Sequence, residues 1–395
     1  MSRTPAHAPP PPLHFRGVVL GPSGFAAQGR EWLSLLEAIG LAPSLHGARL
    51  GALDGGETDD ERACIARAAA RRPQRGRVTV HHVLPPHFAP DPDAIADVVV
   101  TVFETTSLPP GWGPSLTRAA AVVVPAPAIA EAFVRGGVPA ERVHAIAPPV
   151  ATAPFLRPAT PWDALPPRRD GVRRLLTVAD WSLRKGIDVL LPAFARACRE
   201  GEAELIVKVV PRAGLDRAEL ERHCRRVVQR CAAGTPPQVH VVDALLTGEQ
   251  LPQLYAACDA LVLPSRGEGW GRPVHEAMLC GLPVVATDAG ALATLLPDER
   301  VGYPVATSCA PVSAAASHES PVFAGQHWWE PDPDDLARQL QRCVRDPAEA
   351  AVRGRRGRDH VLALCEPQGV AAAFCRVLDA AAHTDAPTVE ALSCR

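Results

Sequence analysis

The sequence lacks the features that mark several classes of protein. None of its apolar runs reaches the ~18 residues that a membrane-spanning helix needs, and MSRTPAHAPPPPLHF, at its start, lacks the apolar core of a signal peptide. Its 11 cysteines include no CxxC pair, so neither a disulfide framework nor a zinc site is indicated. We therefore expect a cytoplasmic protein with reduced cysteines and no transmembrane segment.

The chain also lacks an excess of charge of either sign. Its 41 Lys and Arg residues and 43 Asp and Glu residues leave a net charge of −2. Nucleic-acid-binding proteins usually carry a strong basic excess, so no nucleic-acid partner is expected. The chain is instead rich in apolar residues, 47% of 395, which allows two domains with sizeable cores.

The most informative stretch runs from residue 260 to residue 290. The apolar run at 260–263 is typical of a buried parallel strand, and a loop with three glycines follows it. Pro273 stands where a first helical residue would, and the helix predicted over 274–280 ends at Gly281. Unpaired N–H groups at the start of such a helix attract anions, so the stretch predicts an anion-binding loop.

Two carboxylates, Glu268 and Glu276, frame this loop eight residues apart. A carboxylate accepts several hydrogen bonds and therefore suits the vicinal hydroxyls of a sugar. An acidic residue in a first helical turn also complements the helix dipole. From the residues alone, an ordinary glycine-rich turn therefore remains the alternative to a sugar and phosphate site.

The segment EGWGRPVHEAMLCGLPVVAT, from Glu268 to Thr287, resembles the E-x7-E signature of retaining glycosyltransferases of family 4, which have the GT-B fold. In that family the first glutamate contacts the donor sugar and the second binds the nucleotide ribose. The resemblance assigns these roles to Glu268 and Glu276. It also implies a backbone surface for the sugar hydroxyls and the diphosphate, formed by Gly269, Trp270, Gly271 and Arg272.

A second loop follows the strand predicted at 175–179. Its sequence RKGIDVLLPAF, which begins at Arg184 and Lys185, resembles the phosphate-binding loop of the same family. Two basic residues near a turn are otherwise usually solvated. Many relatives carry Gly-Arg directly after this strand, where this chain has Ala179 and Asp180. Either Arg184 replaces the missing arginine or donor binding is weakened.

The resemblance places three further residues near the donor. Gly24, in the turn after the first strand, would approach the diphosphate from the first domain. His81 or its neighbour His82 would hydrogen-bond the reacting sugar. The residues alone fit equally well with a loop histidine whose hydrogen bonds are made within the protein. The backbone near Leu245 would lie beside the nucleotide base.

Two other patterns admit a functional and a structural interpretation. FETTSLPPGW, which contains Glu104, resembles a segment in one branch of the family, so Glu104 either faces the acceptor or caps a strand. The D-x-D sequences at 91–93 and 332–334 match the spacing of metal-dependent transferases. Both contain proline and precede helical patterns, so we interpret them as turns and helix N-caps.

Strands alternate with helices in both halves, which predicts an α/β fold with two Rossmann-like, doubly wound parallel-sheet domains facing a cleft. Residues 306–327 are predicted to form a long loop. The predicted divisions are a disordered tail 1–14, an acceptor-side domain 15–151, an exposed proline-rich linker 152–171, a nucleotide-sugar-binding domain 172–360, a C-terminal helix 361–382 that could cross back to the first domain, and a tail 383–395.

The resemblance implies a retaining glycosyltransferase that moves a sugar from a nucleotide-diphospho-sugar to a carbohydrate, lipid-linked or small-molecule acceptor. Neither a metal nor another cofactor is expected, because basic side chains and helix dipoles would stabilise the leaving diphosphate. The predicted catalytic residues are Glu268, Arg184, Lys185 and His81. The alternatives are a non-catalytic nucleotide-sugar-binding protein, and a sugar phosphorylase or epimerase of the same fold.

Overall fold

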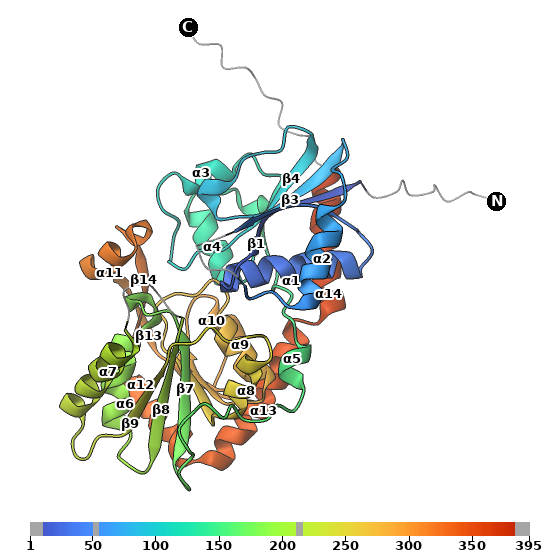
Figure 1. Cartoon of the computed structure of the whole chain (residues 1–395). Coiled ribbons are helices and arrows are strands. Elements are labelled where there is room, and N and C mark those ends of the chain that lie inside the picture. The colour runs from blue at the N-terminus through green and yellow to red at the C-terminus, as the bar shows by residue number, and fades with distance from the viewer. Residues whose placement is uncertain (1–10, 50–54, 211–215, 384–395) are drawn as a thin grey trace.

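The protein has two domains, and each is built on a six-stranded parallel sheet (Figure 1). The structure, a computed structural model, describes residues 11–49, 55–210 and 216–383. The strands of the first sheet lie in the order β2 (Ser44–Arg49), β1 (Leu13–Leu20), β3 (Arg77–His82), β4 (Ala94–Val100), β5 (Ala121–Val124) and β6 (Val143–Ala145). Those of the second lie in the order β12 (Tyr303–Val305), β11 (Val284–Thr287), β10 (Ala260–Leu263), β7 (Arg173–Ala179), β8 (Ala203–Val209) and β9 (Gln238–Val242).

Helices pack on the two faces of both sheets, which confirms the predicted doubly wound arrangement. Around the first sheet these are α1 (Gly24–Ala38), α2 (Asp59–Ala69) and α14 (Pro367–His383) on one face, with α3 (Trp112–Leu116) and α4 (Pro127–Arg135) on the other. Around the second they are α6 (Ile187–Ala197), α7 (Arg217–Cys231) and α12 (Pro333–Arg345), opposed by α8 (Gln250–Ala256), α9 (Arg272–Leu279), α10 (Leu292–Leu295) and α13 (Pro347–Leu364).

The loops at the carboxyl ends of the strands lead into helices with defined starts. Ser23 caps α1, because its hydroxyl accepts a hydrogen bond from the backbone N–H of Ala26 at 3.1 Å. Gly271, with φ of +88°, turns the chain into α9, and Pro273 occupies its first turn. These two starts position the glycine loops of the first and second domains.

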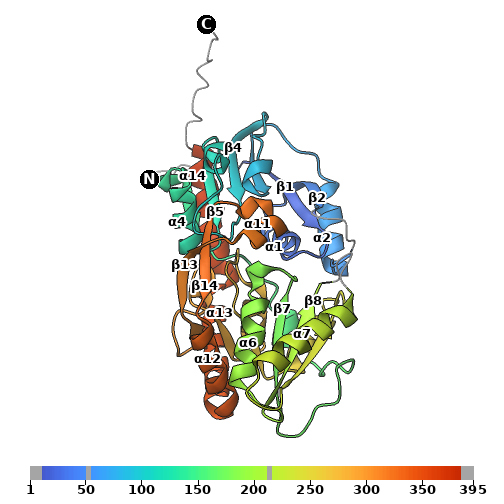
Figure 2. The ribbon, with the colours of Figure 1, turned by 90° about the vertical axis from the view of Figure 1, so that its left-hand side faces the viewer.

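The last helix returns to the first domain. Figure 2 shows α14 in the upper domain, although α13, which precedes it, belongs to the lower one. The Phe374 ring packs on Trp32 of α1, with ring centroids 4.5 Å apart. The predicted tails were too long, because Leu13 and His14 belong to β1 and His383 ends α14, while residues 1–10 and 384–395 lie outside the described ranges.

One part of the described chain, Pro347–His383, contains an 18-residue stretch with a mean hydropathy of 1.4, so by length and composition alone it meets the test for a membrane-crossing helix. The structure divides it into α13 and α14, and the second helix begins at Pro367. Core helices of water-soluble proteins pass the same test, so this is weak evidence for a span. The prediction that no segment crosses a membrane stays a prediction.

The proline-rich segment between the domains is mostly exposed, as predicted, but two of its side chains anchor it. It contains a short helix, α5 (Ala153–Leu156), and its side chains Phe155 and Leu165 are buried in a core shared with α8 and α9. The Arg168 guanidinium also forms an ion pair with Asp259 at 2.5 Å. Two buried apolar side chains and one ion pair therefore hold a segment whose other residues lie largely in solvent.

Residues 306–327 were wrongly predicted as a loop. They contribute to an antiparallel hairpin of β13 (Thr307–Pro311) and β14 (His327–Pro331), whose connection holds α11 (Ala314–Glu319). The hairpin reaches the first domain, where the Thr106 N–H donates to the carbonyl of His327 at 2.9 Å. Phe323 lies 5.8 Å from Phe103, between ring centroids. The pairing partners are too far apart in sequence for local pattern to reveal them.

Candidate functional site

The glycine loop between β10 and α9 lies against the first domain. A Cβ added to Gly267 would stand 1.9 Å from the carbonyl oxygen of Glu104, and one added to Gly269 would stand 3.0 Å from the Cβ of Val102. Both of these neighbours follow β4, at the carboxyl end of the first sheet. The two domains therefore meet at the loop that the sequence predicted to bind a ligand.

We expect Gly267→Ala to destabilise this domain junction by about 1–3 kcal/mol, because the new methyl group would overlap a backbone atom that cannot rotate away. The measurement is the free energy of unfolding in denaturant. Gly234→Ala is the matched control, since no atom lies within 4 Å of its added Cβ and its φ is not left-handed. Equal stability of the two variants would contradict the close contact.

A cluster of four charged side chains lies beside the loop and contains three of the predicted catalytic residues. The Lys185 ammonium donates to Glu268 at 2.7 Å, and both side chains are buried. Arg184 donates to the Gly267 carbonyl at 2.8 Å and lies 3.8 Å from Glu268. Asp180 lies 3.4 Å from Arg184 and 3.9 Å from Lys185. The fold thus brings the phosphate-loop bases and the first signature glutamate together.

The carboxylates around Arg184 favour its charged form. Burial lowers the pKa of Arg184, but the charges of Glu104, Glu268 and Asp180 outweigh burial and raise that pKa above its usual value. Burial raises the pKa of Asp180, yet Arg184 and Lys185 bring it below the usual value. An ammonium has three donors and Lys185 uses one on Glu268, so two remain for phosphate oxygens.

The second signature glutamate belongs to another buried group. Glu276 accepts a hydrogen bond from the Tyr255 hydroxyl at 2.9 Å and lies 3.4 Å from the Arg272 guanidinium. Arg272 in turn donates to both carboxylate oxygens of Glu31 on α1, at 2.6 and 3.2 Å. This chain of contacts joins the start of α9 directly to the first domain.

Burial raises the pKa of Glu276 above its usual value, and the opposing effects of Arg272 and Tyr255 do not cancel it. The folded protein therefore holds this proton more tightly than the unfolded chain, so ionisation of Glu276 costs stability as the pH rises. We expect Glu276→Gln to gain stability over the wild type as pH rises above the ordinary carboxyl pKa of about 4.3. Unfolding at a series of pH values measures this, and a difference that shrinks with rising pH would contradict it.

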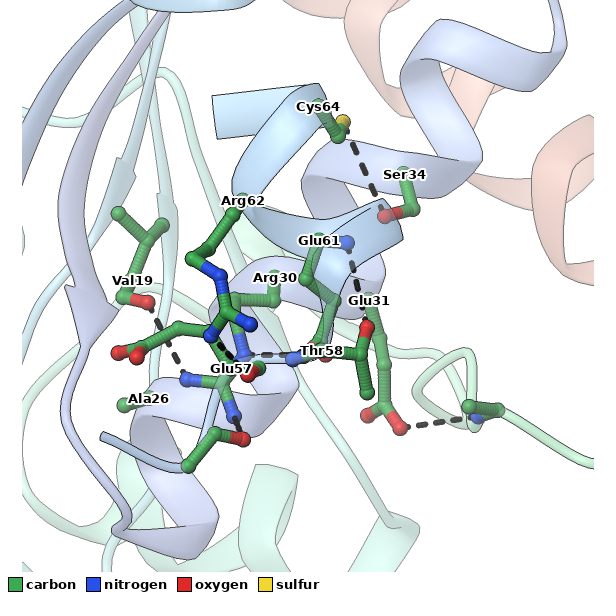
Figure 3. Close-up of polar contacts among 12 residues, drawn as sticks. Val19, Ala26, Arg30, Glu31, Ser34, Glu57, Thr58, Glu61, Arg62 and Cys64 are labelled. Carbon is green, nitrogen blue, oxygen red and sulfur yellow. Dashed lines mark hydrogen bonds and ion pairs between the residues drawn. The ribbon is translucent and has the colours of Figure 1, made fainter. Parts of the chain in front are cut away.

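The glycine turn of the first domain is held in place by Arg30 (Figure 3). Its guanidinium donates to the carbonyl of Val19 at 3.2 Å, as Figure 3 shows. It also donates to the carbonyls of Gly21 and Gly56, at 3.0 and 3.2 Å. A Cβ added to Gly24 would lie 3.2 Å from Cδ of Arg272. Gly24 thus faces the start of α9 across the domain junction, where the resemblance places the diphosphate.

Glu31 ties two parts of this junction together. In Figure 3 its side chain extends from α1 toward the segment that leaves the first domain, where the Ala151 N–H donates to it at 2.9 Å. Its other contact is Arg272, 241 positions away in the sequence. Neither Glu31 nor Tyr255 was predicted, because no local pattern marks a side chain whose partner lies so far along the chain.

The structure does not bring His81 into the charged cluster. Its side chain is 3% exposed, its Nε2 lies 2.6 Å from Asp97, and its ring packs edge-on to Phe88. His82 is also buried, with Nδ1 3.2 Å from the Val18 carbonyl. These contacts satisfy both rings inside the first domain, so a role for His81 at the sugar stays a prediction without support from its contacts.

The D-x-D sequences have structural partners. Asp332 caps α12 and accepts hydrogen bonds from the N–H groups of Asp334 and Asp335, as the N-cap interpretation predicted. Asp91 pairs with Arg77 at 2.8 Å inside the first domain. Within residues 11–49, 55–210 and 216–383, no group of three His, Cys, Asp or Glu side chains has the arrangement of a metal site.

The two remaining predicted residues differ in exposure. The Trp270 side chain is buried, and its indole N–H donates to Nδ1 of His275 at 2.9 Å. The indole is therefore not available to a ligand, and the predicted role of the Trp270 backbone stays a prediction. Leu245 is 42% exposed, in the segment that follows β9. A role for the backbone near Leu245 beside the nucleotide base stays a prediction.

This architecture is a pair of Rossmann-like domains that meet at the glycine loop, which is the GT-B class. It resembles that of Anabaena HepE in complex with UDP and glucose, with a TM-score of 0.62 and 13% identity over 93% of this chain and 99% of that one. Sucrose-phosphate synthase from Thermosynechococcus elongatus also gives a TM-score of 0.62, at 19% identity over 93% and 98% of the two chains.

Residues 172–320 match the family described as Glycosyl transferases group 1. Over 178 residues, or 45% of its length, the chain is 32% identical to D-inositol 3-phosphate glycosyltransferase from Salinispora tropica. Over 219 residues it is 30% identical to MMP alpha-(1->4)-mannosyltransferase from Mycolicibacterium hassiacum. These matches cover 32% and 45% of the relatives, so the chain spans less than half of either.

The second domain thus belongs to the glycosyl transferase group 1 family, as the signature from Glu268 to Thr287 predicted.

Proposed function

We propose that the protein is a retaining glycosyltransferase that uses a nucleotide-diphospho-sugar donor and needs no metal ion. The observation that carries the proposal is the convergence of Lys185, Glu268 and Arg184 on the glycine loop, between two domains of the GT-B class. Helix N–H groups and two cations at this place would take the charge of a leaving diphosphate.

Each group then has a chemical task. Glu268 would accept hydrogen bonds from hydroxyls of the donor sugar, and Glu276 from those of the ribose. Lys185 and Arg184 would hold the diphosphate as its bond to the sugar breaks. The leaving phosphate would take the proton of the acceptor hydroxyl on the same face of the sugar, so no protein nucleophile is required.

The acceptor and the location of the protein belong to the proposal as well. The hydroxyl that receives the sugar, on a carbohydrate, a lipid-linked molecule or a small molecule, would enter from loops of the first domain. Glu104, which contributes to the charge around Arg184, stands at this edge of the junction. We place the protein in the cytoplasm, where activated nucleotide sugars would be its donors.

The decisive experiment first measures the binding of UDP, GDP and ADP to the wild-type protein. Calorimetry and the shift of the unfolding midpoint both report this binding. UDP is the first probe because HepE was solved with it. Release of nucleoside diphosphate from matching nucleotide sugars is then measured over a panel of acceptors, with and without EDTA. We expect binding, acceptor-dependent release that EDTA leaves unchanged, and a product that keeps the anomeric configuration of the donor.

A non-catalytic nucleotide-sugar-binding protein is the second candidate. It is favoured by Asp180, a carboxylate where many family members have arginine, 3.9 Å from Lys185. Tight donor binding without release or transfer for any acceptor would establish it. Product formation that depends on added inorganic phosphate would instead indicate a phosphorylase, and interconversion of the free nucleotide sugar would indicate an epimerase.

A further inference from the structure

Lysine is rare in this protein. Of its 41 Lys and Arg residues only two are lysines, Lys185 and Lys208. Both belong to the second domain and both are buried, with 8% and 6% of their surface exposed. Lysine is almost never this buried without a charged partner. Lys185 has such a partner in Glu268, so the position of Lys208 requires its own explanation.

Lys208 lies near the carboxyl end of β8, next to the ligand edge of the second sheet. It is in register with Val178 of β7 and Val242 of β9. Side chains alternate along a strand, so Lys208 shares a face with Ile206, which is buried in the same core as Tyr255. This is the face of the sheet on which α8 and α9 pack.

No hydrogen bond or ion pair joins the Lys208 ammonium to another described residue, and its Nζ is not among the unpartnered side-chain atoms that are closed off from solvent. The nearest part of the chain outside the described ranges, residues 211–215, contains no Asp or Glu. Burial lowers the pKa of Lys208 below its usual value, and the charge that acts against this is that of Glu276. Glu276 is therefore the carboxylate whose charge acts on Lys208.

We propose that Lys208 is a nucleotide-binding residue, whose ammonium donates to an oxygen at the nucleoside end of the donor. This inference rests on the proposed function, which assigns the ribose to Glu276. The ligand oxygen would supply the acceptor that the protein lacks around this buried cation. Leu245, exposed three residues beyond Val242, would lie under the base. A compact ammonium fits such an enclosed place better than the broad fork of an arginine.

Two parts of a nucleotide have an oxygen that can accept a hydrogen bond from the Lys208 ammonium. A carbonyl of uracil or guanine presents an oxygen that adenine does not possess. A ribose hydroxyl or the α-phosphate presents the same oxygen in every nucleotide. The experiment separates them by comparing UDP, GDP and ADP as ligands.

The test is calorimetric titration of wild type, Lys208→Met and Lys208→Gln with the three nucleoside diphosphates. We expect methionine to weaken binding by about 10-fold to 100-fold, the usual worth of one charge-assisted hydrogen bond. Glutamine keeps a donor and should give an intermediate affinity. The unfolding midpoint of the free Lys208→Met protein should equal or exceed that of wild type, because an unpaired buried charge has been removed.

The possible outcomes are distinct. A loss confined to UDP and GDP supports the inference with a base carbonyl as acceptor, and an equal loss for all three supports it with ribose or phosphate. Unchanged affinity in Lys208→Met, or weaker binding together with a lower unfolding midpoint in both variants, would overturn it. If wild type binds no nucleoside diphosphate, the proposed function fails together with the inference, whereas unchanged affinity of the variant removes only the inference.

Discussion

Replacing Lys185 with methionine is expected to slow sugar transfer by about 10²–10³-fold, the usual effect of removing one preorganised group that stabilises developing charge. Lys185 is buried beside the glycine loop and has two donors that Glu268 does not use. The charge on the leaving diphosphate grows as its bond to the sugar breaks, so the loss should appear in kcat. Steady-state rates at saturating donor measure it.

A double variant separates chemistry from folding. Lys185→Met alone leaves the buried Glu268 carboxylate without its 2.7 Å partner, which would itself destabilise the protein. Lys185→Met combined with Glu268→Gln removes both charges and should restore the unfolding midpoint but not the rate. A Lys185→Met protein that transfers sugar at the wild-type rate would exclude Lys185 from the reaction.

Replacing Glu31 with glutamine is expected to lower the free energy of unfolding by about 3–5 kcal/mol, as breaking a buried ion pair usually does. Glu31 receives two hydrogen bonds from Arg272 across the domain junction. Burial lowers the pKa of Arg272, but Glu31 and Glu276 together raise it above its usual value. Loss of the Glu31 charge would therefore leave a buried cation with one carboxylate, 3.4 Å away.

Denaturant unfolding followed by two probes, one in each domain, measures this effect. We expect the two transitions to coincide in wild type and to separate in Glu31→Gln, because the variant loses a contact that joins the domains. The control is Asp298→Asn, which breaks the ion pair with Arg300, whose side chains are 36% and 81% exposed. That substitution should leave the free energy of unfolding unchanged. If Glu31→Gln also left it unchanged, the junction would not depend on the pair of Glu31 and Arg272.

The fold was largely predictable because its signals are local. The run at 260–263 was predicted as a strand and forms β10 with the same bounds. The helix after it begins one residue before Pro273, because Arg272 already follows the left-handed turn at Gly271. The hairpin of β13 and β14 was not predictable, since its register joins residues such as Thr307 and Pro331 across an inserted helix.

The site was predictable where one motif contains several of its residues. The spacing of Glu268 and Glu276 placed both at the second domain's glycine loop. Two motifs that resemble one family placed Lys185 and Glu268 near the same donor, whereas their direct pairing, across 83 positions of sequence, was not predicted. His81 shows the opposite case, because a histidine near the end of a strand looks the same in the sequence whether it faces a ligand or, as here, pairs with Asp97 inside the domain.

The sequence by itself determined the alternation of strands and helices, the glycine loop and the identity of the bases beside it, because each depends on residues that are neighbours in the chain. Only the tertiary structure decided that Glu31 holds Arg272, that Gly267 touches Glu104, and that Lys208 is buried without a partner. These facts depend on how the two domains pack. Packing brings together side chains that are far apart in the sequence, and no local sequence pattern indicates such contacts.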